Sequence, residues 1–560
     1  MNPQGPDRFT VGFAASGGYS GFRHRGMRLL RHGLAVFAFF VAGTQPKAFG
    51  NPPTNREMRP KVDVGRNENG IPDSTSAMLP LTNLPPSARM HWDRVGLDGA
   101  PPNFTNVLNV KQYGATGNGA TDDASAINAV ISQAPDRSVV YLPAGIYRLT
   151  QPLYLKPNII LRGADPVLTS LLFEGTGTVD RCIGIIRWDR QQSTDYVTPT
   201  AGMDLGSIEL TVSSVADIRP GDLIEIEEDN DPAWKLNDEW QQRLAGQINR
   251  VRAVDTVNRR LRLDRPLRHG FTLQRNPRLR RLSAIENVGI ENLFVRRMDA
   301  VNGYTIEMKY AVRCWVRNVE SFKTYKGHVW MDRAYECEVR QNYFHDSYVL
   351  GGEGQGYGVG SGKRTSDCLV EDNVFRQLRH SMIVGIGANG NVYGYNYSTE
   401  RAIDPVNGTV QADLSVHGNY VYLNLFEGNI VEDADVPDWY WPLGPGNTLF
   451  RNRITNIGTA ISVGSSYQNF IGNVLTRGTL TMAKSLEGVV DCGNVKQGET
   501  QNVSWVDCPT RNIPASLYRS VPPAFVLDAA GVSWPPIGPD KPLDSETPSQ
   551  QRYSSGQYLP

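Results

Sequence analysis

The fold is decided by residues 109–134, which read NVKQYGATGNGATDDASAINAVISQA. They run from a strand through a Gly-rich turn into an amphipathic helix that Asp122 or Asp123 is placed to cap. The apolar face of this helix is formed by Ala126, Ile127, Val130 and Ile131. Segments 139–149 (VVYLPAGIYRL) and 153–165 (LYLKPNIILRGAD) follow, cut by Pro and Gly. Both are predicted to be short strands.

The segments GATGNGATDDASAINAVI (114–131) and VVYLPAGIYRL (139–149) resemble the opening of pectate-lyase-superfamily proteins. The resemblance implies an all-β fold, a right-handed parallel β-helix that starts with an N-terminal capping helix. Related members are glycoside hydrolase family 28-like or polysaccharide-lyase-like. The resemblance does not imply one activity, because hydrolases, lyases, epimerases and phage tailspikes share this opening. It implies that the Asp pair caps the helix rather than performing catalysis.

A repeated V-x-x-N pattern extends this prediction to residue 494. Aligned on the final Asn, nine segments repeat at spacings of 26, 24, 31, 23, 33, 23, 21 and 21 residues. Such units fit the coils of a parallel β-helix, in which equivalent residues stack about 4.8 Å apart. Asn suits a left-handed corner, and its amide can bond to its copy one coil away. The predicted ladder consists of Asn292, Asn318, Asn342, Asn373, Asn396, Asn429, Asn452, Asn473 and Asn494.

Side chains two positions after several of these Asn residues are predicted to stack inside the coils. They are Phe344, Phe375, Val431, Ile454 and Leu475.

Composition excludes some classes of function. The 57 Lys and Arg residues balance the 57 Asp and Glu residues, so no surplus of positive charge is available to bind nucleic acid. The 55 Gly and 36 Pro residues exceed average usage, which agrees with many short elements joined by turns. The chain is therefore predicted to be one solenoid at 106–510.

Other segments flank or interrupt this solenoid. Residues 206–272 alternate in period two around a Pro-Gly turn and predict a small antiparallel β insertion. Residues 51–105 are predicted to be an extended leader. A Pro-rich strap is expected within 511–560, with a disordered tail at 543–560.

The region 1–50 has the character of a secretory signal peptide, with Met27 as the better start. Arg28 and Arg31 precede the ten-residue apolar run LAVFAFFVAG (34–43), which is too short to cross a membrane. We expect a secreted, periplasmic or cell-surface protein with no membrane attachment once the signal is removed. Cys492 and Cys508 lie close enough in sequence to form a disulfide, and no cysteine pattern indicates zinc.

Two long spacings place extra loops at 343–372 and 397–428, and extra length on a solenoid often builds a binding face. His345, His380 and His417 lie in or near these loops, as does Arg379. Four histidines within 90 residues, counting His328, favour a functional role for at least one of them.

Acidic residues recur at the fourth position after the ladder Asn. Asp346, Glu400 and Asp433 occupy it on nearby coils, so Glu400 and Asp433 are predicted to lie roughly 5 Å apart. Carboxylate pairs at such distances serve glycoside hydrolases. The alternative is that this position is only a turn, where acids and amides are common. Asp413 is a further candidate acid.

Substrate-binding candidates surround these acids. Aromatic faces beside hydrogen-bonding acids suit a sugar, whose C–H faces stack and whose hydroxyl groups bond. The candidates are His345, Glu353, Gln355, Tyr357, Trp439, Tyr440 and Trp441.

Three functions follow from these residues. The leading prediction is an exported glycoside hydrolase that cleaves a polysaccharide with an Asp/Glu pair drawn from Asp346, Glu353, Glu400, Asp413 and Asp433. The alternative is a polysaccharide lyase, in which His380, His417, His345 or Tyr357 abstracts the proton next to a uronate carboxyl that Arg379 neutralises. A non-catalytic carbohydrate-binding surface protein is the third.

No cofactor or metal is required by these predictions, although the acidic loop 432–438 could hold Ca²⁺ through its oxygen ligands. The partner is predicted to be a polysaccharide. The sequence leaves the sugar and the oligomeric state open.

Overall fold

The computed structural model describes residues 92–97, 99–175, 181–234, 238–351, 354–406, 408, 410–437 and 442–556. The chain divides into two compact units, Met1–Thr54 and Asn55–Pro560, and the described residues all belong to the second. The predicted signal region and most of the leader therefore lie outside the described residues. Within those described ranges, no helix combines the length and apolar character needed to cross a membrane.

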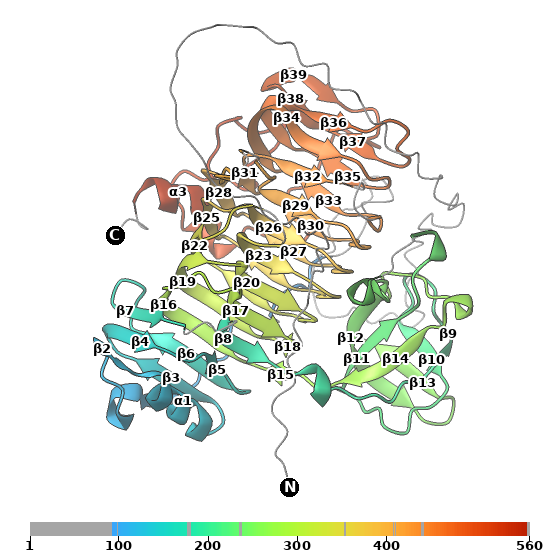
Figure 1. The fold of residues 1–560 in the computed structure, drawn as a ribbon. Helices are drawn as coiled ribbons and strands as arrows, with labels where there is room; N and C mark the ends of the chain where they lie inside the picture. Colours follow the sequence, from blue (N-terminus) through green and yellow to red (C-terminus); the bar gives the residue numbers. More distant parts are fainter. Residues whose placement is uncertain are drawn as a thin grey trace, which may run out of the picture. The chain divides into compact units, whose positions relative to one another are not determined.

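The main architecture is a parallel β-helix whose strands pair coil on coil in three ladders (Figure 1). The first ladder contains β1 (Asn106–Asn109), β3 (Ser138–Leu142), β6 (Ile159–Gly163), the starts of β16 (Gly289–Arg297) and β19 (Trp315–Thr324), β21 (Glu338–Arg340), β24 (Leu369–Glu371), β27 (Val392–Gly394), β30 (Leu425–Glu427), β33 (Thr448–Phe450), β35 (Asn469–Ile471) and β37 (Val490–Cys492). The second contains β2 (Asn118–Asp122), β4 (Gly145–Leu149), β7 (Thr169–Phe173), the ends of β16 and β19, β22 (Tyr343–Ser347), β25 (Val374–Arg376), β28 (Tyr397–Thr399), β31 (Ile430–Val431), the starts of β34 (Arg453–Val463) and β36 (Val474–Met482), and β38 (Asn494–Lys496).

The third ladder carries the candidate site described below. It contains β5 (Leu153–Tyr154), β8 (Arg181–Ile186), β17 (Tyr304–Lys309), β20 (Gly327–Asp332), β23 (Tyr357–Ser361), β26 (His380–Val384), β29 (Leu414–Val416), β32 (Ala434–Val436) and the ends of β34 and β36. A short pair, β15 (Ile285–Glu286) with β18 (Ala311–Val312), joins the early coils, and β39 (Glu499–Ser504) pairs antiparallel with β38.

The inside of the coils holds one continuous apolar core. In the second ladder, Phe344 pairs in register with Phe375, and Ile454 with Leu475. These side chains and Val431 are fully buried, so the predicted inward stack is confirmed. Helix α1 (Ala124–Gln133) adds Ile127, Val130 and Ile131 to the same core.

The predicted Asn ladder is formed continuously from Asn342 to Asn494, whereas Asn318 donates back to Asn292 Oδ1 at 3.0 Å. From Asn342 to Asn494, each side-chain amide donates to the Oδ1 atom of the next Asn at 2.8–2.9 Å. The same Oδ1 atom also accepts the backbone N–H of the preceding Asn, as Asn396 does for Asn373 at 3.0 Å. The amide also donates to a backbone carbonyl, as Asn396 does to Val370. These buried amides are therefore fully bonded.

The corner geometry differs from the prediction. Asn292 and Asn318 adopt the left-handed conformation themselves, but in later coils the residue before the Asn adopts it, for example Asp372 and Tyr395. The Asn is thereby free to point inward. A second amide ladder of Asn391, Asn424, Asn447 and Gln468 runs along another corner, and the alignment on V-x-x-N did not reveal it.

The predicted insertion is a six-stranded antiparallel sheet and is wider than residues 206–272. Its strands are β9 (Pro199–Ala201), β10 (Glu209–Val212), β11 (Leu223–Glu227), β12 (Gly246–Asp255), β13 (Arg260–Leu263) and β14 (Arg278–Leu282). Short 3₁₀ helices lie within the insertion at Pro232–Trp234, Glu239–Gln241 and Leu273–Arg275, and before it at Val110–Tyr113 and Asp189–Gln191. The sheet has an apolar core of its own.

The prediction of a disordered tail at 543–560 is wrong for the described residues 543–556, which include a helix. Helix α2 (Ala524–Leu527) is followed by α3 (Pro548–Ser554), which begins at the N-cap Thr547 and has a Pro in its first turn. Arg552 in α3 donates to both carboxylate oxygens of Asp372 at 2.8 and 3.0 Å. A buried carboxylate on the solenoid thus holds the tail in place. Cys492 and Cys508 form a disulfide.

Replacing Asn396 by Ala is expected to lower the free energy of unfolding by roughly 3 kcal/mol or more, because several buried polar groups lose their partners together. Urea denaturation followed by circular dichroism measures this loss. Asn512→Ala is the control, because Asn512 is exposed and its replacement should change stability by less than about 0.5 kcal/mol. Equal stability of the two variants would contradict a supporting role for the ladder.

Candidate functional site

Terminal segments cover the outside of the first ladder. Trp92 Nε1 donates to the Leu423 carbonyl at 2.9 Å, and the backbone N–H of Leu97 donates to Glu338 Oε1 at 3.1 Å. Farther along the chain, Phe104 packs with Val139. The N-terminal segment 92–104 therefore crosses several coils as a strap.

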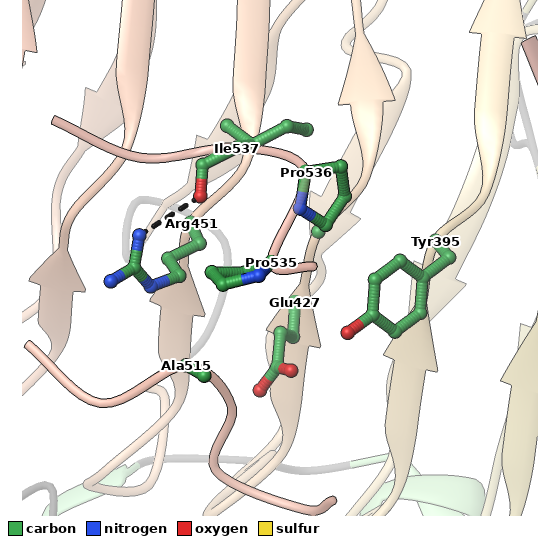
Figure 2. A pocket seen from close by; sticks show the side chains of 8 residues that line it. Tyr395, Glu427, Arg451, Ala515, Pro535, Pro536 and Ile537 are labelled. Atoms are coloured by element: carbon green, nitrogen blue, oxygen red, sulfur yellow. Dashed lines mark hydrogen bonds between the residues drawn. The ribbon is translucent and has the colours of Figure 1, made fainter. Parts of the chain in front are cut away.

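The C-terminal segment covers the remaining coils of this ladder and part of the second. Leu517 N–H donates to Glu427 Oε2 at 2.8 Å, and Tyr518 OH donates to Glu371 at 2.7 Å. Figure 2 shows the seam beneath the segment, a gap too narrow to hold a water molecule, lined by Glu427, Arg451, Tyr395 and Pro535–Ile537. Burial raises the pKa of Glu427 to about 8. The seam is small and closed over by the strap, so we treat it as a packing contact.

The insertion is bound to the turns that follow strands of the third ladder. Arg364 Nε donates to Glu225 Oε1 at 2.6 Å, and Asn389 Nδ2 donates to the Gly246 carbonyl at 3.0 Å. Trp234 stacks on Tyr420, with ring centroids 4.5 Å apart. The insertion therefore flanks the third ladder on one side.

A row of rings lies along the outside of the third ladder. Tyr304 stacks on Trp330 at 5.3 Å between ring centroids, and Trp330 lies 6.4 Å from Tyr357. The row continues from Tyr357 to His380 at 5.5 Å and from His380 to His417 at 6.5 Å. No described strap crosses this row. We call the outside of this ladder the third face.

Two glycines make room for the indole of Trp330. A Cβ at Gly360 would lie 2.4 Å from the Trp330 ring, and one at Gly362 would lie 2.7 Å from it. Both glycines follow Tyr357 on the next coil, where Gly360 is in register with Trp330. Trp330 can therefore stack between Tyr304 and Tyr357 only because these positions lack side chains.

Arg379 brings a positive charge to the polar end of the row. Its backbone N–H donates to the Gly356 carbonyl at 2.8 Å, and its Nη1 donates to Tyr357 OH at 3.3 Å. Two more polar groups face outward on successive coils, Ser415 and Asp435. Arg379 Nε, Ser415 Oγ and Asp435 Oδ1 are buried and, within the described ranges, have no geometrically well-formed hydrogen bond. Ser415 is nevertheless close enough to Asp435 to act as its hydrogen-bond donor, an interaction that opposes the rise in the pKa of Asp435 caused by burial. A buried polar atom without a partner, such as Arg379 Nε, calls for an explanation, and a bound ligand is one.

The pKa values of this cluster are shifted in both directions. Burial, with a contribution from the nearby charge of Arg379, lowers the pKa of His380 to about 3 and also lowers that of His417. Burial raises the pKa of Asp435 to about 7 and raises the pKa of Tyr357, which Arg379 opposes. At neutral pH the imidazoles are therefore uncharged and the phenol is protonated.

Hydrogen bonding fixes the tautomer of His380. Its Nδ1 lies 2.6 Å from the Ala412 carbonyl oxygen, which can only accept, so the proton is on Nδ1. The lone pair is therefore on Nε2. Tyr357, His380, His417 and Arg379, all predicted from the sequence, are brought together here.

The predicted acids of the second ladder lie elsewhere. His345 bonds to Asp346 at 2.9 Å and to Glu320 at 3.2 Å, and Arg376 links Asp346 to Glu400. Although burial opposes the charge of His345, these two carboxylates raise its pKa. Tyr553 of α3 also donates to Glu400 at 2.9 Å. This group is an ion network at a corner. Asp346 and Glu400 have positive φ, which supports the turn alternative for this position.

Asp433, which was predicted to lie close to Glu400, and Asp413, a separate candidate acid, are engaged in other contacts. Asp413 is fully buried and accepts hydrogen bonds from Ser398 Oγ at 2.9 Å and Ser381 Oγ at 3.2 Å. Asp433 is paired with Arg401. Burial raises the pKa of both acids, that of Asp413 to about 7. Neither carboxylate faces the third face as a catalytic pair would.

Several predicted residues lie outside the described ranges, namely Glu353, Trp439, Tyr440 and Trp441. Gln355 is half-buried in the turn before β23. Among the described residues, no three His, Cys, Asp or Glu side chains are grouped to hold a metal. The calcium alternative in loop 432–438 includes Asp438, which also lies outside those ranges, so it stays a prediction.

Sequence reasoning missed Tyr304, Trp330 and Ser415 as members of this face, and it included Asp435 only as one of the acids of loop 432–438. Glu307, Trp330, Gly360, Ile383, Ser415 and Asp435 share one register position. The sequence signal that could have identified this position is its fixed spacing from the inward-facing residues of the same strand. Aligning the sequence on the Asn corner does not reveal this shared position, because loops of different length separate that corner from the third ladder.

Gly360→Ala is expected to displace the Trp330 ring and lower the free energy of unfolding by about 1–3 kcal/mol. Thermal unfolding measures the loss. Gly270→Ala is the control, because its Cβ would meet only Leu205 N at 3.5 Å. Equal melting temperatures for these two variants would contradict the packing described for Trp330.

Comparison with known proteins agrees with the observed fold. Residues 107–201 match the family model described as "Rhamnogalacturonase A/epimerase, pectate lyase-like". The tailspike protein gp49 of Pseudomonas phage LKA1 has a TM-score of 0.50 and 16% identity, covering 67% of this chain and 64% of that chain. At that identity the likeness shows the fold alone. The resemblance to the pectate-lyase superfamily and the parallel β-helix are thus confirmed.

Curated relatives match only short stretches. A probable glucan endo-1,3-beta-glucosidase of Arthroderma benhamiae is 39% identical over 69 residues, which are 11% of this chain and 8% of that protein. Alginate lyase 7 of Azotobacter vinelandii is 32% identical over 124 residues, 20% of this chain and 13% of that protein. The chain thus spans only a small part of the length of these relatives.

Proposed function

We propose that this pectate-lyase-like parallel β-helix protein is a carbohydrate-active enzyme that cleaves an acidic polysaccharide on its third face by β-elimination. The observation that carries the proposal is the cluster in which Arg379 lies beside Tyr357 and next to His380. A cation, a neutral imidazole and a protonated phenol are the three groups that an elimination next to a carboxylate needs. The short matches to a glucanase and an alginate lyase support a polysaccharide as the substrate class.

In the proposed reaction, Arg379 binds the carboxylate of a uronate unit. Neutralising that carboxylate makes the proton on the adjacent carbon C5 more acidic, because it stabilises the negative charge that develops there. His380 Nε2 takes this proton, and the electron pair of the C–H bond forms a C4–C5 double bond. The C4–O bond breaks, and Tyr357 OH donates its proton to the leaving oxygen. The products are an unsaturated uronate end and a new hydroxyl end.

The tautomer of His380 suits the role of base, because it leaves the lone pair on Nε2. The Ala412 carbonyl orients the ring by accepting from Nδ1, as a third group orients the base in other catalytic sets. A carboxylate that arrives beside Arg379 raises the pKa of His380 from its low value, since a nearby negative charge favours the imidazolium. The base thus becomes stronger when substrate is bound.

A glycoside hydrolase, the leading prediction from sequence, remains the second candidate because of Asp435. Its raised pKa, about 7 through burial, is what a general acid needs in order to protonate a glycosidic oxygen. Among the described residues, however, the other predicted carboxylates are engaged in ion pairs or buried away from Asp435. The geometry therefore favours elimination.

We also propose that the protein is exported. The apolar segment 34–43 has the character of a signal sequence. The Cys492–Cys508 disulfide supports an oxidising compartment.

Incubation with a panel of acidic and neutral polysaccharides tests the proposed reaction. We expect an unsaturated, ultraviolet-absorbing product from a uronate polymer. Arg379→Gln is expected to reduce the rate about 100-fold or more. Arg376→Gln is a matched control, because Arg376 belongs to the corner ion network. Equal rates in the two variants would remove Arg379 from the reaction. New reducing ends without absorbance, abolished by Asp435→Asn, would establish hydrolysis instead.

The pH dependence of kcat/KM gives a second test. Protonation inactivates the base, so the rate falls as pH drops through the pKa of His380, which lies near 3 in the free protein. The acid limb is therefore expected well below pH 6.5, and the alkaline limb above pH 10, where Tyr357 loses its proton. An acid limb centred near pH 6.5 would assign the base to another group.

A further inference from the structure

The inserted loop between β28 and β29 is closed at its base by charged groups. At its start, the backbone N–H of Arg401 donates to Glu432 Oε1 at 3.1 Å, and its guanidinium pairs with Glu432 and Asp433. At its end, Asp413 N–H donates to Asp433 Oδ1 at 3.1 Å. Asp413 Oδ2 also accepts the Glu432 backbone N–H at 2.9 Å. Both ends of the loop are thus held by the same two residues of the next coil.

Asp413 connects this closure to the third face. Its carboxylate accepts from Ser381 Oγ, and Ser381 is the neighbour of His380. The residue before Asp413 is Ala412, whose carbonyl accepts from His380 Nδ1 at 2.6 Å. The dipeptide Ala412–Asp413 therefore holds the dipeptide His380–Ser381 at two points, one from the backbone and one from the side chain.

We propose that Asp413 is a positioning residue for the third face, which fixes the ring and tautomer of His380 by anchoring the returning end of the 401–412 loop. This inference rests on the function proposed above for the role of His380. Asp413 touches no reacting atom, because it is fully buried in the corner between the second and third ladders. It acts through Ala412. The carboxylate predicted from sequence to be catalytic thus has a different role.

The arrangement has a clear consequence if Asp413 is removed. Ser381, Ser398 and the Glu432 N–H lose their acceptor, and the loop end is no longer held. Ala412 O then shifts from His380 Nδ1, and the imidazole can take either tautomer. A misplaced base lowers kcat by about 100-fold, whereas substrate binding by Arg379 is retained.

Three variants test the proposal. Asp413→Ala is expected to lower kcat about 100-fold with little change in KM, and Asp413→Asn, which keeps an acceptor for both serines, is expected to restore most of it. Arg401→Gln opens the other end of the loop and is expected to act in the same direction. The control is Asp404→Asn, a buried acid of the same loop whose side chain, among the described residues, accepts from Val406 N at 2.8 Å within its own turn.

Nitrogen NMR of histidine-labelled protein supplies a readout that is independent of activity. His380→Gln identifies the His380 signals. Wild type and Asp404→Asn are expected to show a proton on Nδ1, and Asp413→Ala a mixture of tautomers. Wild-type kcat and tautomer in folded Asp413→Ala would overturn the proposal. If Asp413→Ala does not fold, Arg401→Gln decides it: a mixture of tautomers supports the proposal, and the wild-type tautomer overturns it. If no polysaccharide is cleaved, the proposed function fails, and the NMR result still decides the role of Asp413.

Discussion

The return of each coil to the same register is the constraint on which the rest of this structure depends. A buried Asn at one corner of each later coil bonds in three directions: to its copy in the next coil, to the backbone N–H of its neighbour, and to a carbonyl. Because the corner is bonded through side chains, the chain between two corners can vary from 21 to 33 residues without loss of register. The long loops that surround the third face are tolerated for this reason.

The distribution of covering segments then decides which surface is available for function. The N-terminal segment crosses the first ladder, the C-terminal segment and α3 cover parts of the first and second, and the insertion is bound at the turns after the third. Each cover is fixed by bonds to buried carboxylates such as Glu338, Glu427 and Asp372. The acids of these ladders thus serve attachment. The third face keeps Arg379, whose Nε atom has no hydrogen-bond partner among the described residues, and we propose that a ligand binds there.

The charges of the molecule are organised in two ways. At the corner of the second ladder, Glu320, His345, Asp346, Arg376 and Glu400 neutralise one another in a partly exposed chain. On the third face, Arg379 is near Tyr357 and uncharged imidazoles, and among the described residues no carboxylate lies at ion-pair distance from it. A cation in this setting attracts an anionic substrate group, since its charge is not already compensated by a close partner. The corner network and the cluster on the third face contain similar types of residue, but they differ in the residues that lie opposite their charged groups.

The sequence by itself determined the local features: the opening strand and helix, the repeated Asn corner, the inward stack of Phe344 and Phe375, and the insertion. All of these follow from short-range patterns or from a repeat of nearly constant length. It also grouped Tyr357, Arg379, His380 and His417 together, but with His345 among them. Only the tertiary structure decided that His345, Asp346 and Glu400 belong to a corner network, that Asp413 is internal, and that Trp330 belongs to the face. The physical reason is that loops of unequal length break the sequence spacing between corners, whereas pairing between coils restores the register in space.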